Sequence, residues 1–305
     1  MISLRLQRSS NDRWWPTRGE THFARSIPGG WRVAARYRDR MERYTHGHHD
    51  SVLRSHRWRT VENSAAYLTS HLESGRSLLD VGCGPGTLTV DLARRVARGR
   101  VVGVDSVEAI VEQARADVPD GVSNVSFKVG DVYALDFEDG TFDIVHAHQV
   151  LQHLNDPVAA VREMRRVCRP GGVVAVRDAD YAAMTWFPGD ERLDRWLSLY
   201  RAVASANGGQ PDAGRYLLHW AHEAGFSEVE ASASAWCFAA PEEREWWGGL
   251  WADRIRQSSL ADHAIQSGLA TPADLEDLAA GWLAWVADPD GSFTVPHNEV
   301  VVEVA

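Results

Sequence analysis

The clearest chemical signal in the sequence is a glycine-rich segment, Asp80-Val81-Gly82-Cys83-Gly84-Pro85-Gly86. It lies between a short apolar run and a segment with a helical apolar stripe. Glycine lacks a Cβ, so the backbone can turn tightly there and approach a ligand closely. The first turn of the following helix offers unbonded N–H groups to the same ligand. The segment therefore predicts a binding site for a ligand with polar groups.

An acidic residue, Asp105, stands nineteen residues after Gly86, at the end of the next apolar run. A carboxylate in that place can accept hydrogen bonds from both ribose hydroxyls of an adenosine ligand. Each such charge-assisted bond contributes about 1.5–3 kcal/mol. The glycines at positions 82, 84 and 86 fall as G-x-G-x-G, whereas dinucleotide-binding folds favour G-x-G-x-x-G. The pattern favours an adenosine-containing cofactor and disfavours the alternative of a nicotinamide oxidoreductase.

Apolar runs alternate with helical stripes between residues 76 and 180, and these elements must position the two motifs. Asp156 followed by Pro157 marks a helix start, and the turn at 169–172 (RPGG) ends that helix. Strands separated by helices of this length predict a parallel sheet that helices cover on both faces. We expect the strands at 77–81, 100–104, 125–129, 142–147 and 173–176.

Outside this core the regular alternation of apolar runs and helical stripes ends, so we divide the chain into five parts. Residues 1–40 contain nine arginines and three acids and show no sustained period. We expect a disordered or non-native extension there, with a basic arm for an acidic partner as the alternative. The other parts are N-terminal helices that close over the cofactor (41–75), the core (76–180), a helical cap with one core helix and strand at 216–237 (181–298), and the last strand of the sheet (299–305).

The composition excludes several classes of protein. The 305 residues are 44% apolar and 24% charged, which is ordinary for a globular protein and excludes disorder of most of the chain. No apolar run approaches the roughly 20 residues of a membrane span. The formal charge of −10 argues against a nucleic-acid-binding surface. Cys83, Cys168 and Cys237 show neither disulfide nor zinc spacing, so we expect a cytoplasmic protein.

Four short motifs occur in one order along the core. They are the segment 80–86, the acidic Val104-Asp105-Ser106, the turn Gly130-Asp131-Val132, and the turn at 169–172. Together they resemble the motifs of class I methyltransferases that use S-adenosylmethionine. The resemblance covers about residues 76–180. It implies an α/β, Rossmann-like, doubly wound fold, with a mostly parallel seven-stranded sheet, a helical cap and S-adenosylmethionine as the cofactor.

The resemblance also implies roles for the matching positions. Backbone groups around Gly82 and Gly84 would hold the methionine part of the cofactor. Asp105 would bind the ribose, and Asp131 the adenine amine, although a plain turn residue remains the alternative for Asp131. In relatives, the segment before the first strand closes over the cofactor. The expected cofactor site comprises Asp80, Gly82, Gly84, Gly86, Asp105, Ser106, Asp131, Val132, His148, Tyr44 and Arg57.

The predicted fourth strand runs into a histidine-rich stretch, 146–154 (HAHQVLQHL), where acceptor chemistry is expected. It resembles the same stretch of small-molecule methyltransferases, including the C-methyltransferases of ubiquinone and menaquinone synthesis. Some relatives use a histidine there as general base, and His153 matches that place best. A structural role for His153 is the equally weighted alternative. His148 is expected near the methionine part, and Asp178 could orient or replace the base.

His46, His48 and His49 could suggest a metal site, but nothing fixes their spacing on one helical face. No acidic cluster accompanies them, so we expect no metal. Most tryptophans of 181–285 are expected in the core of the cap. We expect Trp186 and Trp246 to line an acceptor pocket.

The acceptor is expected to be a small organic molecule: a quinol, a phenol or a specialised metabolite. The Asn-Pro-Pro-aromatic tetrad of many nucleic-acid amino-methyltransferases is absent at 147–150, which reads AHQV. This absence and the acidic charge argue against a nucleic-acid acceptor. The alternative is a cyclase or a non-methylating module that binds the cofactor on the same scaffold. A homodimer is one possible assembly.

Overall fold

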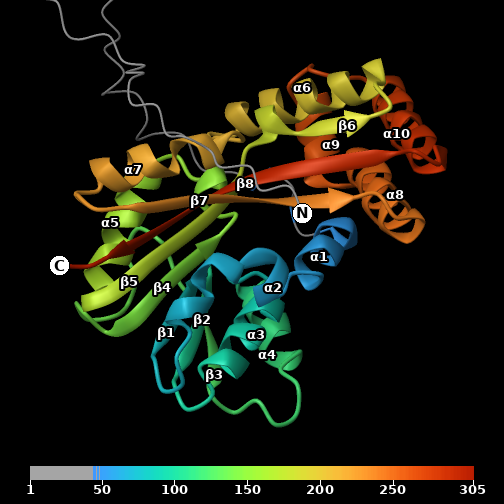
Figure 1. Ribbon diagram of the computed structural model, residues 1–305. Helices are drawn as coiled ribbons and strands as arrows, with labels where there is room; N and C mark the ends of the chain where they lie inside the picture. The colour runs from blue at the N-terminus through green and yellow to red at the C-terminus, as the bar shows by residue number, and fades with distance from the viewer. Residues whose placement is uncertain (1–43, 46, 48) are drawn as a thin grey trace, which may run out of the picture. The chain divides into compact units, whose positions relative to one another are not determined.

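The computed structural model describes residues 44, 45, 47 and 49–305, so the predicted extension at 1–40 lies outside the described residues. Strands and helices alternate through the core, as the sequence predicts, and the chain beyond the core is mainly helical (Figure 1). The strands are β1 Leu78–Val81, β2 Val101–Asp105, β3 Val125–Val129, β4 Phe142–His148, β5 Cys168–Ala179, β6 Thr185–Phe187, β7 Glu230–Phe238 and β8 Ser292–Glu303. The α-helices are α1 Asp50–Arg57, α2 Val61–Ser64, α3 Thr87–Arg95, α4 Glu108–Ala116, α5 Pro157–Val167, α6 Glu191–Ala206, α7 Leu217–Glu223, α8 Pro241–Gln257, α9 Ser259–Gln266 and α10 Pro272–Ala287.

The strands form one sheet with the order β3-β2-β1-β4-β5-β8-β6, and β7 pairs with the other edge of β8. The first five are parallel, and β8 is antiparallel to β5, β6 and β7. The mostly parallel, doubly wound α/β fold is therefore confirmed. From β1 the chain adds strands first on one side of the sheet (β2, β3) and then on the other (β4, β5), so the strand order reverses between β1 and β4. In such sheets ligands bind at the carboxyl ends of the strands beside this reversal.

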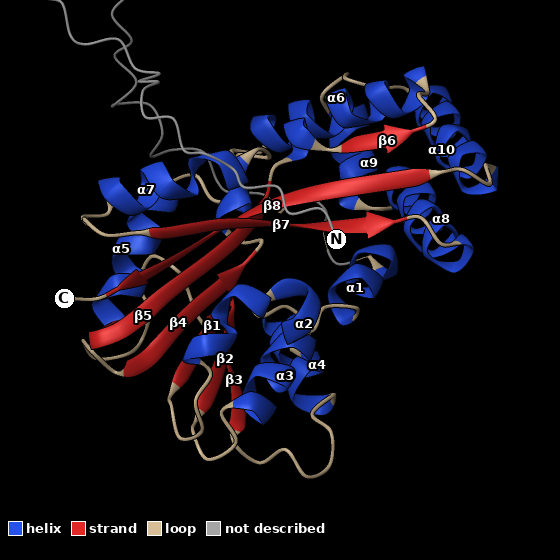
Figure 2. Cartoon of the chain, viewed as in Figure 1, coloured by secondary structure: helices blue, strands red, loops and turns tan. Residues whose placement is uncertain are grey.

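Helices cover both faces of the parallel sheet, as Figure 2 shows. Successive strand residues point to opposite faces, so Leu79 packs into the core beneath α5 and α7, whereas Leu78 packs against α3 and the N-terminal helices. Helix α5 begins as predicted, because the Asp156 carboxylate accepts the N–H of Ala159 and proline occupies the first turn.

Three details of the sheet differ from the sequence-based expectation. Strand β5 begins at Cys168, so residues 169–172, which the sequence predicts as a turn, belong to it. All seven expected strands are present, and β6 is an eighth that pairs Thr185–Phe187 with Ser292–Thr294 of β8. The last strand begins at Ser292 instead of residue 299, so β8 starts within the cap and ends in the sheet (Figure 1). The extra strand is three residues long, too short for a periodic pattern to reveal it.

The cap contains α6, α8, α9 and α10 together with β6 and one end each of β7 and β8 (Figure 1). Its core is aromatic. Trp196 packs edge-on against Trp251 and Trp282, with ring centroids 4.6 and 4.8 Å apart. Fully buried indole rings of this kind supply large apolar contact area per residue. The aromatic core fixes α8 and α10 beside the carboxyl edge of the sheet.

None of the helices within residues 49–305 combines the length and the apolar character needed to cross a membrane.

Candidate active site

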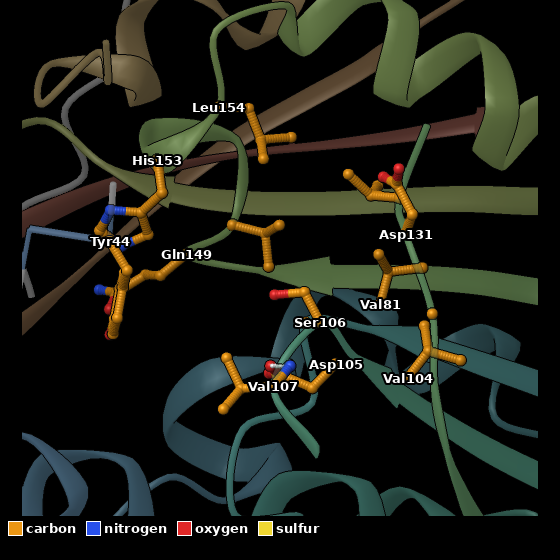
Figure 3. A pocket seen from close by; sticks show the side chains of 14 residues that line it. Tyr44, Val81, Val104, Asp105, Ser106, Val107, Asp131, Gln149, His153 and Leu154 are labelled. Carbon is orange, nitrogen blue, oxygen red and sulfur yellow. Dashed lines mark hydrogen bonds between the residues drawn. The ribbon is translucent and has the colours of Figure 1, made fainter. Parts of the chain in front are cut away.

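A cavity of about 290 Å³ opens at the carboxyl ends of β1, β2 and β4, where the fold predicts a ligand site. Figure 3 shows Tyr44, Gln149 and His153 together at one end, with Asp131 and Val104 toward the other. Fourteen described residues line it: Tyr44, Val81, Gly82, Val104, Asp105, Ser106, Val107, Gly130, Asp131, Val132, Gln149, Val150, His153 and Leu154.

The glycine-rich turn after β1 depends on glycine at each of its three positions. Gly82, Gly84 and Gly86 have φ values of 67°, 54° and 81°, a region that side-chain-bearing residues disfavour. A Cβ on Gly82 would collide with the side chain of Val150, and one on Gly86 would lie 2.6 Å from the ring of Phe127. Gly82 lines the cavity, whereas Gly84 and Gly86 shape the turn behind it.

Asp105 ends β2 at the cavity, half-buried, and both of its carboxylate oxygens accept backbone hydrogen bonds. Oδ2 accepts the N–H of Gly84 at 3.0 Å, and Oδ1 accepts the N–H of Val107 at 3.1 Å. A carboxylate oxygen has more than one acceptor site, so Asp105 retains capacity for two hydroxyl donors. Ser106 follows it along the cavity wall.

Asp131 and Val132 line the cavity beyond Val104, as the motif resemblance implies. Asp131 is exposed, and its Oδ1 accepts the N–H of Tyr133 at 2.9 Å in a tight turn. Val104, Val132 and Val150 provide apolar walls on which a flat ring could pack.

The other end of the cavity is built around Gln149, which directly follows β4. Gln149 has a φ of 54°, unusual for a residue with a side chain, and such conformations cluster at functional sites. Its Oε1 accepts a hydrogen bond from Arg59 at 2.5 Å, and its amide nitrogen lies 2.8 Å from Nε2 of His297. Sequence reasoning missed this residue, because neither its type nor its neighbours indicate a left-handed backbone.

His153 lies beside Gln149 and borders the cavity. Its ring meets Tyr44 edge-on with centroids 4.8 Å apart, and its Nε2 is 3.0 Å from the amide nitrogen of Gln152. Burial, and then the charge of Arg59, lower the pKa of His153 to about 3. Burial raises the pKa of Tyr44 to about 12. Both side chains are therefore neutral at pH 7.

Of the two predicted residues before β1, only Tyr44 lies at the cavity. Arg57 is exposed at the end of α1 and belongs to none of the hollows described here. Arg59, two residues later, does not line the cavity either, but its guanidinium reaches Gln149 at the cavity end, and burial lowers the pKa of Arg59 to about 10. The short link between α1 and α2 turns this second arginine inward.

Asp80 and His148 lie outside the 290 Å³ cavity and border a smaller recess with Cys83. Asp80 is buried, and its two oxygens bind Thr89 at 2.6 Å and Nδ1 of His146 at 2.8 Å. His148 is also buried, and both its ring nitrogens lack a hydrogen-bond partner among the described residues. Burial, and then the charges of nearby arginines, lower its pKa well below the ordinary value.

Asp178 lies in β5 beneath the loop that carries His153, and it does not line the cavity. Its Oδ1 accepts the N–H of Gln152 at 3.2 Å. Its Oδ2 is buried without a partner among the described residues. Burial raises the pKa of this carboxyl to about 7. Its neighbour Asp180 forms an ion pair with Arg215 at 2.7 Å.

A second recess continues from the cavity under the cap, and the two share Tyr44, Gln149 and His153. Trp236 and Trp247 form part of its wall. The two tryptophans expected there lie elsewhere. Trp186 stacks on Phe293 with centroids 5.6 Å apart, and Trp246 borders a surface hollow beside α10.

Among the described residues, no group of three His, Cys, Asp or Glu side chains is arranged to hold a metal ion. His46 and His48 lie outside the described residues.

The residues that line the cavity fit S-adenosylmethionine in their chemistry. Gly82 lines the cavity without a side chain, so its backbone groups are open to a ligand there. Asp105 offers acceptors for ribose hydroxyls, and the valine walls suit an adenine ring. A volume of about 290 Å³ is close to the lower end of cofactor sites in general.

Comparisons with known proteins show which family the chain belongs to. Residues 72–225 match the family model described as a methyltransferase domain. The chain is 35% identical over 270 residues to an uncharacterised methyltransferase of Schizosaccharomyces pombe, covering 85% of this chain and 95% of that one. It is 35% identical over 164 residues to a demethylmenaquinone methyltransferase of Roseiflexus castenholzii, covering 52% of this chain and 64% of that one. The YcgJ protein of Bacillus subtilis shares the fold, with a TM-score of 0.50, 20% identity, and coverage of 79% of this chain and 97% of that one.

The chain therefore belongs to the methyltransferase family. It is a class I methyltransferase that uses S-adenosylmethionine, with the Rossmann-like fold of that class.

Proposed function

We propose that this chain methylates a small organic acceptor, such as a quinol, a phenol or a specialised metabolite. The observation that carries the proposal is the continuity of two hollows. The 290 Å³ cavity leads from Asp105 to Tyr44, Gln149 and His153, and the recess continues from those three residues under the cap. An acceptor that enters from the cap side would meet the cofactor at this junction.

The recess itself has a volume of about 20 Å³, which admits a small group of the acceptor but not a ring, so a flat body would lie at the junction and toward the cavity. Met184, Trp236, Trp247 and Val295 line the recess and give it partly apolar walls. When bound, S-adenosylmethionine supplies an activated methyl group on its sulfonium. The chain's contribution is alignment of the acceptor atom for in-line displacement, which can lower the barrier by several kcal/mol.

Of the three residues that border both hollows, Tyr44, Gln149 and His153, only the histidine is a base of ordinary strength near neutrality, so it is our candidate to receive a proton from the acceptor. Its lowered pKa keeps the imidazole neutral at pH 7, and a neutral imidazole can accept a proton. The same lowered pKa makes it a weak base. It therefore suits an acceptor that becomes acidic during methyl transfer, as a phenol does.

The test is a methyl-transfer assay on the full chain with S-adenosylmethionine and a panel of phenols, hydroquinones and catechols. We expect S-adenosylhomocysteine and a methylated product to accumulate in equal amounts with at least one acceptor. His153→Ala should reduce kcat by about a hundredfold or more while the Kd for S-adenosylmethionine changes less than twofold. The exposed His222→Ala on α7 is the matched control.

Two results would contradict these assignments. Tight binding of S-adenosylmethionine without product from any member of the panel would exclude this acceptor class. An unchanged kcat in His153→Ala would give that histidine a structural role only.

A further inference from the structure

Two arginines, Arg59 and Arg254, line the recess under the cap. Arg254 on α8 is 4% exposed, and Arg59 is half-buried in the link between α1 and α2. Nη2 of Arg254 donates to the carbonyl of Ser51 at 3.0 Å and to Oγ of Ser55 at 2.9 Å. Nη2 of Arg59 donates to the amide oxygen of Gln149. All these acceptors are neutral.

Neither guanidinium has a carboxylate partner in the part of the chain that the structure describes. The Nε atoms of Arg59 and Arg254 are buried there without a hydrogen bond. The thirteen described residues that line the recess include no aspartate or glutamate. Of the other buried arginines, Arg177 donates from Nε to Glu299 at 3.0 Å, whereas Arg244 donates to two backbone carbonyls.

Buried charge without a counter-charge is unfavourable, and two like charges in one recess increase that cost. The charge of Arg254 acts with burial to lower the pKa of Arg59. Of the titratable side chains that line the recess, Tyr44, Tyr181 and His153 are neutral at pH 7. The carboxyl of Asp178, whose pKa Arg59 lowers, lies outside this lining, and burial keeps its pKa at about 7. An anion between the two arginines would remove this imbalance.

The position of the recess indicates which ligand brings that anion. Arg254, Tyr181 and Met184 belong to the cap and lie beyond the junction at Tyr44 and His153, away from Asp105. The recess is therefore on the acceptor side of the site. Its volume of about 20 Å³ admits one small polar group, and a guanidinium fork matches a planar carboxylate.

We propose that the acceptor carries a carboxylate, which binds between Arg59 and Arg254 while its apolar body lies toward the cavity. This inference rests on the proposed function, because it assigns the substrate class of the same site.

The test compares carboxylic acids with their amides, which match in shape and lack the charge. The full chain is first titrated calorimetrically with S-adenosylhomocysteine and then, when saturated, with benzoate, salicylate and cinnamate and with the three corresponding amides. At least one acid should bind tenfold or more tightly than its amide.

Arg254→Gln should remove that preference for the acid, and Arg254→Lys should retain part of it. Arg256→Gln on the same helix, whose partners are the surface acids Asp253 and Glu276, is the control and should keep the preference.

The outcomes separate this inference from the proposed function. Failure of S-adenosylhomocysteine to bind would contradict the cofactor site itself. Normal cofactor binding with equal affinities for every acid and its amide would overturn the carboxylate subsite. A tenfold loss of S-adenosylhomocysteine affinity in Arg254→Gln would overturn it as well, because the recess would then hold the methionine carboxylate. Circular dichroism confirms folding of each variant, and Arg254→Lys keeps the test valid if Arg254→Gln does not fold.

Discussion

The carboxylate of Asp105 holds the backbone of Gly84: its Oδ2 accepts the Gly84 N–H at 3.0 Å. The acid at the end of β2 therefore fixes the glycine turn that follows β1, at the point where these parallel neighbours meet the cavity. Two motifs that sequence reasoning treats as separate are one hydrogen-bonded unit. Asp105 can thus act on the cofactor directly and also through the shape of the turn.

Replacing Asp105 should weaken cofactor binding more when the acceptor oxygens are lost than when only the charge is lost. Asp105→Ala removes the acceptors for Gly84 and for the ribose, so we expect the Kd for S-adenosylmethionine to rise at least tenfold, about 1.4 kcal/mol. Asp105→Asn keeps one oxygen for the turn and should raise the Kd less. Isothermal titration measures both. Equal affinities for the wild type and Asp105→Ala would mean that the acid does not contact the cofactor.

Gly82 should tolerate no side chain, whereas a surface glycine with a similar backbone should. Gly82→Ala meets Val150 in addition to its strained φ of 67°, so we expect it to lower the Tm and to abolish measurable cofactor binding. Gly121 has a φ of 87° and open space around its Cβ position. Gly121→Ala should therefore cost only the backbone strain, about 1–2 kcal/mol, with normal cofactor affinity. Thermal shift with and without S-adenosylmethionine compares the two, and similar losses of binding would contradict a special role for Gly82.

The parallel core was predictable because its elements are set locally. Each predicted strand from 77–81 to 173–176 is a short apolar run bounded by polar or glycine-rich turns, and Asp156-Pro157 specifies its helix through a local cap. Strand β6 and the first half of β8 were missed for the opposite reason. Their pairing joins Thr185 to Thr294 across more than a hundred residues, and no local pattern specifies such a partner.

Within the site, residues held by backbone motifs were predictable and residues placed by tertiary packing were not. Gly82, Asp105 and Asp131 lie at the cavity because strand ends position them. Arg59 reaches the cavity end and Arg57 does not, yet the two are the same residue type two positions apart. Their difference comes from how α1 ends against the cap, which depends on contacts with α8.

The charge of Arg59 should control the pKa of His153. Burial is the larger cause of the lowered pKa and Arg59 the second, so Arg59→Gln should raise the pKa while leaving it below the ordinary value of about 6.5. NMR titration of the imidazole resonances measures this pKa. Arg57→Gln, exposed at the end of α1, is the matched control and should leave it unchanged. A His153 pKa that does not move in Arg59→Gln would show that the two side chains are not coupled.

Asp178 should make the stability of the fold depend on pH in a direction opposite to that of most carboxylates. Its pKa is raised to about 7 by burial, whereas an unfolded aspartate titrates near 4. Between these values the folded state binds more protons than the unfolded state, so the contribution of Asp178 is fully present below pH 4 and is lost as pH rises to 7. Each pH unit in this window changes the free energy of unfolding by up to about 1.4 kcal/mol.

Asp178→Asn isolates this contribution, because asparagine keeps an oxygen for the N–H of Gln152 but cannot ionise. We expect the variant to gain stability relative to the wild type from pH 5 to pH 8, with the difference levelling off above pH 7. Urea unfolding at each pH gives the free energies, and the exposed Asp120→Asn serves as the control. A stability difference between Asp178→Asn and wild type that stays constant with pH would mean that this carboxyl is already ionised at pH 5. The charges of Arg177 and Arg59, which act against burial on this carboxyl, would then outweigh the effect of burial.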